Sequence, residues 1–270
     1  MCKVLKLNRS TYYKHINHVE SVREIESEHL CAEIKKIFYC SKRRYGAPKI
    51  HRVLLENGFN ASIKRVQRKM VLMGLRSIVV KKYHYYSKTS AFSEKQNLLN
   101  QDFSTTSINQ KWCTDITYIH SAKDGWSYLA SVMDFHSKKI IGWAFGKQMT
   151  TELALKAVQN ACLNVTDTTG IILHSDLGSQ YTSLQFEQYL TSMGIRHSFS
   201  RKGCPYDNAC IESFHSVLKK EEVNLHHYYD FKEAYSSIFE YIESWYNRTR
   251  IHGSLNFMTP DAVHQAASIA

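Results

Sequence analysis

The sequence predicts a mixed α/β domain preceded by an all-α, basic region, and three observations lead to this fold class. Positive charge is concentrated in the first part of the chain. The spacing of apolar residues changes from helical to strand-like near residue 110, and strand-like runs then alternate with helix-like ones. We therefore expect a helical, basic DNA-binding region with a linker at residues 1–100. An α/β core should follow at residues 101–225, with a helical extension packing on it at residues 226–270.

Composition excludes several classes of protein. The chain has 270 residues, of which 43% are hydrophobic and 12% aromatic, so it is not a disordered polypeptide. No apolar run approaches the 18 residues that suggest a membrane span, and no apolar stretch follows the basic N-terminus. The seven cysteines are scattered without CxxC spacing, and Cys204, Cys210 and His215 match no common zinc motif. We expect a cytoplasmic protein with reduced thiols and no membrane partner.

The charge of the chain is divided unevenly. The 35 Lys and Arg exceed the 24 Asp and Glu, which gives a net charge of +11. Residues 1–100 contain 21 basic and 7 acidic side chains, whereas the remainder contains 14 and 17. Because a basic surface attracts phosphate backbones regardless of sequence, this asymmetry favours a nucleic-acid-binding module. A helical domain that is merely basic is the alternative.

Helical signals fill the N-terminal region. Apolar spacing predicts helices at Ile25–Tyr39, Pro48–Asn57 and Ile63–Met73, the last with Ser62 as its N-cap. A short helix pair within Met1–Lys14 and a strand at Lys81–Lys88 are weaker expectations. The last two long helices form a helix-turn-helix whose final helix has a basic outer face. We expect that face to contact DNA through four residues, namely Lys64, Arg65, Arg68 and Lys69.

Beyond Gln110 the pattern predicts a five-stranded sheet with flanking helices. Three strands in a row, consistent with antiparallel pairing, come first, and the short apolar run Ile171–Leu173 is typical of a buried parallel strand. The predicted elements are strands at Lys111–Ile119, Trp126–Met133 and Lys138–Phe145, a helix at Thr150–Leu163, a strand at Ile171–Leu173, a helix at Ser183–Met193 and a strand at Arg196–Ser200.

Three carboxylates fall at informative places in this domain. Asp115 lies within the first strand, and Asp176 follows the end of the buried strand, where α/β sheets bind ligands. Glu212 lies near the start of a helix that opens at Asp207 and Asn208. Each acid alone has an ordinary alternative role: Asp115 could hydrogen-bond a neighbouring strand, Asp176 could cap a turn with Gly178, and Glu212 could be a solvated acid favoured by the helix dipole. Together, three such acids would form a hard-cation site, in which two divalent ions could act on a phosphodiester.

The sequence segments around these acids resemble those of a known protein family. The segments WCTDITYI, VMDFHSKKIIGW, HSDLGSQYTS, GCPYDNACIESFHSVLKKE and YNRTRIHGSL look like the integrase core of bacterial insertion-sequence transposases. The most similar group is encoded in two overlapping reading frames, and this chain resembles the downstream product. YGAPKIHRVLLENGF and KRVQRKMVLMGL resemble that group's helix-turn-helix segment. The spacing is specific, since 35 residues separate Asp176 from Glu212 and Lys219 follows seven positions later.

The resemblance implies a fold, a reaction and partners. The fold would be an RNase H-like integrase core, a mixed five-stranded sheet with flanking helices. Asp115, Asp176 and Glu212 would be the catalytic metal ligands, with Mg²⁺, or alternatively Mn²⁺, at two ions per active site. The reaction would be DNA cleavage and strand transfer at the ends of an insertion sequence. The partners would be double-stranded DNA (terminal inverted repeats and target), further copies of the chain as a dimer or higher oligomer and, as one option, the upstream-frame product as a fusion or partner. The location would be the bacterial cytoplasm, at the nucleoid.

Further residues are expected near the site. Lys219 lies almost two helical turns after Glu212, so both share one helix face, and Lys219 should reach DNA phosphate. Gln180 and Tyr181 follow Asp176 and are expected to contact DNA, as is Arg250 of the C-terminal segment. Asn208 and His252 are expected to support the site.

Two other functions stay open at this point. A DNA-binding regulator, active in chemistry only when fused to the upstream product, would share the same sequence features. A nuclease of the same fold that hydrolyses without joining is the second alternative, although the helix-turn-helix weighs against it. A structural scaffold leaves the three acids unexplained.

Overall fold

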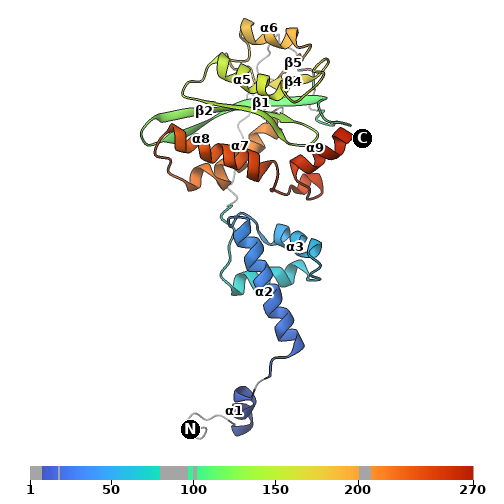
Figure 1. Ribbon diagram of the computed structural model, residues 1–270, viewed down its shortest axis with the longest axis vertical. Coiled ribbons are helices and arrows are strands. Elements are labelled where there is room, and N and C mark those ends of the chain that lie inside the picture. The colour runs from blue at the N-terminus through green and yellow to red at the C-terminus, as the bar shows by residue number, and fades with distance from the viewer. Residues whose placement is uncertain (1–7, 18, 80–96, 100–101, 201–207, 270) are drawn as a thin grey trace. The chain divides into compact units, whose positions relative to one another are not determined.

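The chain is described from a computed structural model, in which two compact units are distinguished (Figure 1). The described residues are 8–17, 19–79, 97–99, 102–200 and 208–269. The first unit comprises Met1–Val79 and the second Val80–Ala270. Leu99 is buried and the Leu98 amide donates to Ser198 Oγ at 2.9 Å, so the second unit includes residues that precede position 101. Each unit is considered by itself below.

The first unit is all-α, and its helices are α1 (Arg9–Ile16), α2 (Val22–Cys40), α3 (Ala47–Glu56) and α4 (Ile63–Leu72). Ser21 and Glu24 form a reciprocal capping box at the start of α2, and Ser62 caps α4 by accepting from the Arg65 amide. The expected helical region and the Ser62 cap are thus confirmed. The first of the two short helices expected within Met1–Lys14 and the strand expected at Lys81–Lys88 lie outside the described residues.

A small apolar core joins α2, α3 and α4. The apolar faces of these helices are buried because their residues recur at helical spacing, as an amphipathic helix requires. The buried side chains are Leu30, Ile34, Ile37, Phe38, Ile50, Leu54, Val66 and Met70. The opposite face of α4 is therefore available to solvent.

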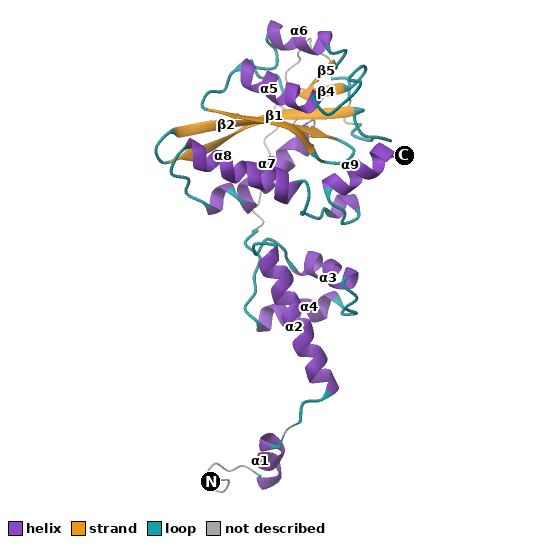
Figure 2. Cartoon of the chain, in the orientation of Figure 1, coloured by secondary structure: helices purple, strands orange, loops and turns teal. Residues whose placement is uncertain are grey.

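The second unit is built on a five-stranded sheet in the order β3-β2-β1-β4-β5 (Figure 2). Its strands are β1 (Lys111–Ser121), β2 (Gly125–Asp134), β3 (Ile140–Gly146), β4 (Ile172–Ser175) and β5 (Arg196–Phe199). The first three pair in antiparallel fashion, whereas β4 is parallel to both β1 and β5. This mixed sheet confirms the predicted fold class and the burial of the short fourth strand.

Helices cover both faces of the sheet. In Figure 1, α5 (Thr151–Cys162) and α6 (Leu184–Ser192) lie on one side, while α7 (Ala209–Glu221), α8 (Phe231–Phe239) and α9 (Pro260–Ile269) lie on the other. The close approach of α5 depends on Gly142 of β3. A Cβ at that position would lie 2.4 Å from both Ala157 O and Ala161 N, so only glycine lets the helix backbone rest on the strand.

The helical extension expected at residues 226–270 is not a regular α-helix throughout. After α8 the chain continues as a π-helical segment, Glu240–Tyr246. Four of its residues are buried: Tyr241, Ile242, Trp245 and Tyr246. Ile242 and Trp245 are buried as the apolar spacing predicts, and the wider turn also brings Tyr241 and Tyr246 to the interior.

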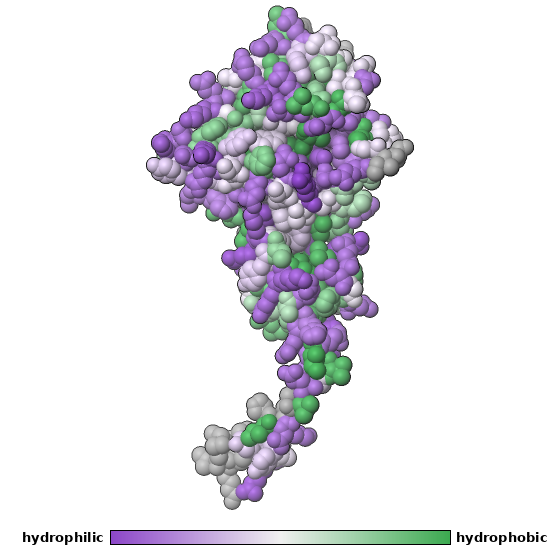
Figure 3. Space-filling model, viewed as in Figure 1, coloured by the Kyte–Doolittle hydropathy of each residue, from purple (hydrophilic) through white to green (hydrophobic). Residues whose placement is uncertain are grey.

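The surface visible in Figure 3 is mostly hydrophilic, and the hydrophobic patches on it are small. None of the helices in the described part of the chain has the length and hydrophobicity needed to cross a bilayer.

Candidate active site

The sheet register places Asp115 and Asp176 side by side. Strands β1 and β4 pair from Lys111 with Ile172 to Cys113 with His174. Asp115 and Asp176 each lie two residues beyond that last pair, at the same edge. Because β4 ends at Ser175 while β1 continues to Ser121, the second half of β1 extends past its parallel neighbour. The two carboxylates therefore lie at the point where β1 continues without β4 beside it.

Asp176 is fixed by the turn that follows β4. Its Oδ1 accepts a hydrogen bond from the Gly178 amide at 2.9 Å. A Cβ at Gly178 would come within 2.9 Å of that same oxygen and 2.7 Å of Gln180 Oε1. An added side chain at Gly178 would thus have to displace the Asp176 or Gln180 side chain, both of which lie against this turn.

Buried histidines hold the end of β4 beneath Asp176. His174 places one ring nitrogen 2.9 Å from Ser198 Oγ and the other 2.9 Å from Ser200 Oγ. Ser175 Oγ lies 2.9 Å from His197 Nε2, and His197 Nδ1 lies 3.1 Å from Glu187. These contacts tie the end of β4, next to Asp176, to β5 and α6.

Helix α7 brings Glu212 to the same edge through His215. His215 lies one turn after Glu212 and is buried; its Nδ1 is 3.4 Å from Asp115 Oδ2, and its Nε2 is 3.4 Å from Ser131 Oγ. The imidazole therefore joins α7 to β1 and β2. Asn208 precedes α7 and is buried, and its side-chain oxygen has no hydrogen-bond partner among the described residues.

The charge of Asp115 affects the pKa values of the other two carboxylates. Partial burial of the Asp176 carboxylate raises its pKa, the Gly178 amide lowers it, and the negative charge of Asp115 raises it further. Burial raises the pKa of Glu212 and so does Asp115, while His215 acts in the opposite direction. Both acids keep contact with solvent, so screening limits the free energy of these shifts.

The donor set suits a hard divalent cation. It consists only of carboxylate oxygens, and burial, with a smaller contribution from the charge of Asp115, makes the other two acids harder to ionise. Within the described ranges, no three His, Cys, Asp or Glu side chains lie close enough to ligate a single ion together. A shared cation would therefore draw these side chains toward one another.

Lys219 stands beside this site, on the same helix as Glu212. Its Nζ lies 4.0 Å from the centre of the Tyr118 ring. Partial burial lowers the pKa of Lys219, whereas the charge of Asp115 raises it. The ammonium therefore lies within the field of Asp115, and the expectation that Lys219 shares the site is consistent with this position.

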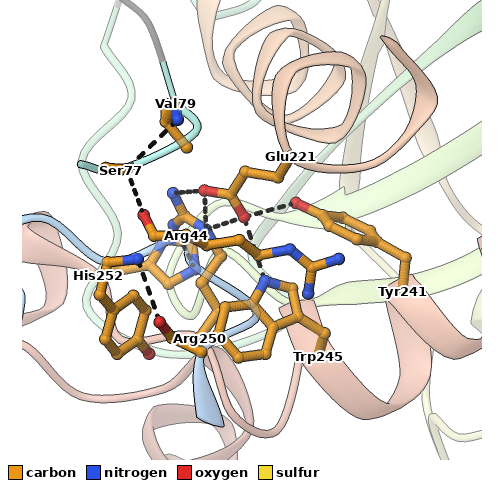
Figure 4. A network of polar contacts seen from close by, with 10 residues as sticks. Arg44, Ser77, Val79, Glu221, Tyr241, Trp245, Arg250 and His252 are labelled. Atoms are coloured by element: carbon orange, nitrogen blue, oxygen red, sulfur yellow. Dashed lines mark hydrogen bonds and ion pairs between the residues drawn. The ribbon is translucent and has the colours of Figure 1, made fainter. Parts of the chain in front are cut away.

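Two residues expected to contact DNA make contacts within the protein instead: Tyr181 is buried and Arg250 is partly buried. Tyr181 is 1% exposed and its hydroxyl lies 3.3 Å from Thr114 Oγ1, so the prediction that it contacts DNA is corrected. Arg250 forms an ion pair with the buried Glu221, Nη2 to Oε1 at 3.0 Å (Figure 4). His252 lies 3.3 Å from Arg250 Nη1. Arg250 thus holds the C-terminal segment, with His252 beside it.

The four basic residues of α4 fall into two pairs. Lys64 and Arg68 are exposed. Arg65 pairs with Glu26 at 3.0 Å, and Lys69 hydrogen-bonds Ser27, both on α2. Only the first pair lies fully on the outer face of the helix, so α4 divides its charges between solvent and the preceding helix.

The sequence alone does not identify the residues that position the acids. It suggests only a zinc site for His215, and no pattern in it singles out His174, Ser175 or His197. The three-residue interval from Glu212 to His215 is a usable signal, because it places both on one helix face. The partners of His174 come from a different strand, and no sequence interval indicates them.

Comparisons with known proteins agree with this architecture. Models of the "Integrase core domain" match residues 106–205 and 193–260, and a model of an "HTH-like domain" matches residues 25–83. The chain is 41% identical over 241 residues to the transposase for insertion sequence element IS904 of Lactococcus lactis, covering 89% of this chain and 95% of that protein. It is 36% identical over 264 residues to transposase InsF for insertion sequence IS3A of Escherichia coli, covering 97% and 91%.

Among solved structures, the chain is similar to the HTLV-2 integrase catalytic core domain in complex with magnesium. The identity is 17% and the TM-score 0.45, with 60% of this chain and 99% of that one covered.

The fold and the matched models define a transposase with an integrase core, a DDE polynucleotidyl transferase. The chain belongs to the family of insertion-sequence transposases that includes the IS3 and IS904 proteins, and it corresponds to the OrfB-type product with its helix-turn-helix region.

Proposed function

We propose that Asp115, Asp176 and Glu212 are the catalytic metal ligands for cleavage and strand transfer at the ends of an insertion sequence. The observation that carries this proposal is the position of Asp115 and Asp176 at equivalent places beyond the last β1–β4 pair, with the charge of Asp115 raising the pKa of both Asp176 and Glu212. Mutually repelling carboxylates at an open sheet edge favour a bound cation.

Two Mg²⁺ or Mn²⁺ ions at these residues would activate the attacking oxygen and stabilise the leaving oxygen of a phosphodiester. The chain's own residues supply the geometry. The Gly178 amide orients Asp176, and His215 holds Asp115 against α7. Lys219 is placed to contact a phosphate of the bound strand. Gln180 lies beside Asp176, where it would contact the same strand, and Asn208, at the N-cap position of α7, would support the site.

The substrate would be double-stranded DNA, namely the terminal inverted repeats and a target. The exposed pair Lys64 and Arg68 on α4 would contact the DNA, and Arg65 and Lys69 would orient α4 against α2. Because transposition joins two ends, we propose that a dimer or a higher oligomer acts on the DNA. The upstream-frame product would contribute either as a fusion or as a partner.

The test is metal-dependent nicking of a labelled duplex that carries a terminal repeat. The full chain, alone and fused to the upstream product, is compared with Asp115→Asn, Asp176→Asn and Glu212→Gln. Glu152→Gln is the control, because Glu152 is an exposed acid in the first turn of α5. We expect each site variant to abolish Mg²⁺-dependent nicking and the control to retain it. Equal nicking by the wild type and Asp176→Asn would contradict the assignment.

A further inference from the structure

An exposed group of aromatic rings lies on the β1–β2 hairpin. Tyr118 and His120 of β1 and Trp126 of β2 form what we call the aromatic platform. Tyr118 is 56% and Trp126 53% exposed, and His120 is also exposed. The ring of Trp126 meets those of Tyr118 and His120 edge to face, with centroids 5.1 and 4.9 Å apart. Single exposed aromatics are ordinary, but an adjoining set at one place indicates a binding surface.

The platform adjoins the carboxylate site. Tyr118 follows Asp115 by three residues on one strand, which corresponds to about 10 Å. That length equals roughly three nucleotides of a stacked DNA strand. Asp115 and Tyr118 point to opposite faces of β1, yet Lys219 of α7 reaches the Tyr118 ring at 4.0 Å. The lysine therefore passes the edge of β1 that extends beyond β4 and bridges the two surfaces.

The hairpin that carries the platform is held in place. Just beyond β1, the amides of Ala122 and Lys123 donate to Tyr228 O at 2.9 Å and to Tyr229 O at 2.8 Å. Ser121 also pairs with Tyr228 in a short parallel bridge. Because these backbone contacts fix the hairpin to the segment after α7, the platform is ordered before any ligand binds. Preorganisation of this kind reduces the entropy cost of binding.

The chemistry of the platform favours a nucleotide. The rings offer faces and edges for stacking, and Lys219 offers a positive charge for a phosphate. A base inside a duplex cannot stack on a protein ring, so the ligand must be unpaired. We propose that the aromatic platform stacks an unpaired base of the DNA strand whose phosphate occupies the carboxylate site, with Lys219 contacting the phosphate between them. This inference rests on the proposed function, because it assumes DNA at the three acids.

The test separates single-stranded from duplex binding with the full chain. The probes are a labelled single-stranded oligothymidylate, the matching duplex, and the same single strand with 5-iodouracil for photocrosslinking. The variants are Tyr118→Ala, Trp126→Ala and Trp126→Phe. Tyr235→Ala is the control, since Tyr235 is a partly exposed tyrosine on α8. Melting temperatures establish that each variant is folded.

We expect Trp126→Ala and Tyr118→Ala to weaken single-strand binding about tenfold, the typical effect of losing one stacking ring. Duplex binding should change little, Trp126→Phe should retain most of the affinity, and Tyr235→Ala should match the wild type. Crosslinks should map to Tyr118, His120 or Trp126. Equal losses on both probes, no loss on the single strand, or crosslinks confined to other residues would each overturn the proposal.

This outcome is independent of whether the three acids catalyse cleavage. A protein that nicks DNA but shows no platform crosslink would refute only the stacking. A protein that crosslinks at the platform but never nicks would refute only the proposed chemistry.

Discussion

Arg250 and Glu221 form a bidentate ion pair at the end of the helix that carries Glu212. The Arg250 Nη2 and Nε atoms lie 3.0 and 3.1 Å from Glu221 Oε1, and Nε is also 3.1 Å from Oε2. Tyr241 Oη and Trp245 Nε1 each donate to Glu221 Oε2 at 3.1 Å (Figure 4). Glu221 is 3% exposed, so a charge at this position must be paired. The pair ties the C-terminal segment to α7.

Arg250→Ala should therefore destabilise the protein. Removal of Arg250 takes a bidentate counter-charge away from the buried Glu221 carboxylate, and we expect a loss of about 3–5 kcal/mol in the free energy of unfolding. Denaturant titration measures this loss. Arg248→Ala is the control, because Arg248 is exposed two residues earlier. If Arg250→Ala were as stable as Arg248→Ala and instead bound DNA more weakly, Arg250 would be a DNA contact after all.

Gly142→Ala should separate α5 from β3. The new methyl group would meet backbone atoms of Ala157 and Ala161 at 2.4 Å, and backbone cannot rotate away as a side chain can. We expect a loss of about 1–3 kcal/mol in the free energy of unfolding, as in other overpacked cores. Gly253→Ala is a matched control, because nothing lies within 4 Å of the place that its methyl group would occupy. Equal stability of the two variants would mean that α5 does not rest on β3 so closely.

The pKa of Asp176 is raised in the folded protein, and this fixes the sign of a pH effect. A carboxyl group with a raised folded pKa favours the folded state only when protonated. Stability is therefore lost as the pH rises from the unfolded pKa through the folded one, and the loss is complete at neutral pH. Asp176→Asn should raise the melting temperature at neutral pH in the absence of divalent ions, as should Glu212→Gln.

Divalent ions should reverse the order of the melting temperatures of the wild type and Asp176→Asn. Mg²⁺ bound to the three acids should raise the melting temperature of the wild type but not that of Asp176→Asn. Asp167→Asn is a control in which the melting temperature should change in the opposite direction. Hydrogen bonds from Thr169 lower the pKa of Asp167, so removing this carboxylate should be mildly destabilising. Equal shifts with Mg²⁺ in wild type and Asp176→Asn would contradict metal binding at Asp176.

Gly178→Ala should reduce activity more than stability. The added methyl group would displace the Asp176 carboxylate oxygen that it meets at 2.9 Å. A displacement near 1 Å in a catalytic group can lower the rate by about 100-fold. Single-turnover nicking measures the rate, and the melting curve of the same variant reports its folding. A Gly178→Ala protein with the wild-type rate would show that the turn does not set the position of Asp176.

The basic helix α4 offers a contrast between two arginines. Arg68 is exposed, whereas Arg65 pairs with Glu26 at 3.0 Å. Arg68→Ala should weaken duplex binding and reduce the slope of log K against log salt by about 1, since one phosphate contact is lost. Arg65→Ala should change that slope less. Identical slopes for the two variants would contradict the division of α4 into an outer and an inner pair.

Much of the fold was predictable because local patterns determine it. The alternation in Lys111–Ile119 predicted β1, and the run Ile171–Leu173 predicted a buried parallel strand. Ser62, Thr150 and Ser183 capped helices as such residues do. Local patterns do not encode long-range contacts, however. The loop that follows Asp176 is polar, yet it turns inward and buries Tyr181 against Thr114.

The same limit applies to the site. Motif and spacing single out Asp115, Asp176 and Glu212, and β1 and β4 do place the first two at one edge. Asp134 lies within an equally recognisable segment but is a structural residue, since its carboxylate accepts from Asn109 and Ser137 at 2.8–2.9 Å. Burial and partners distinguish these two kinds of acid, and both depend on tertiary structure. Arg250 illustrates the same point, because its partner Glu221 lies 29 residues away.

The most direct measurement of the central claim is strand transfer from a pre-cut end. A labelled duplex with an exposed terminal 3′-hydroxyl is mixed with a target plasmid, the protein (with the upstream product fused where the fusion proves necessary) and Mg²⁺, and joined products are counted. We predict joining by the wild type and by Glu152→Gln, and no joining by Asp115→Asn, Asp176→Asn or Glu212→Gln. Joined product at the wild-type level from any of the three site variants would contradict a single metal-dependent site built on these acids.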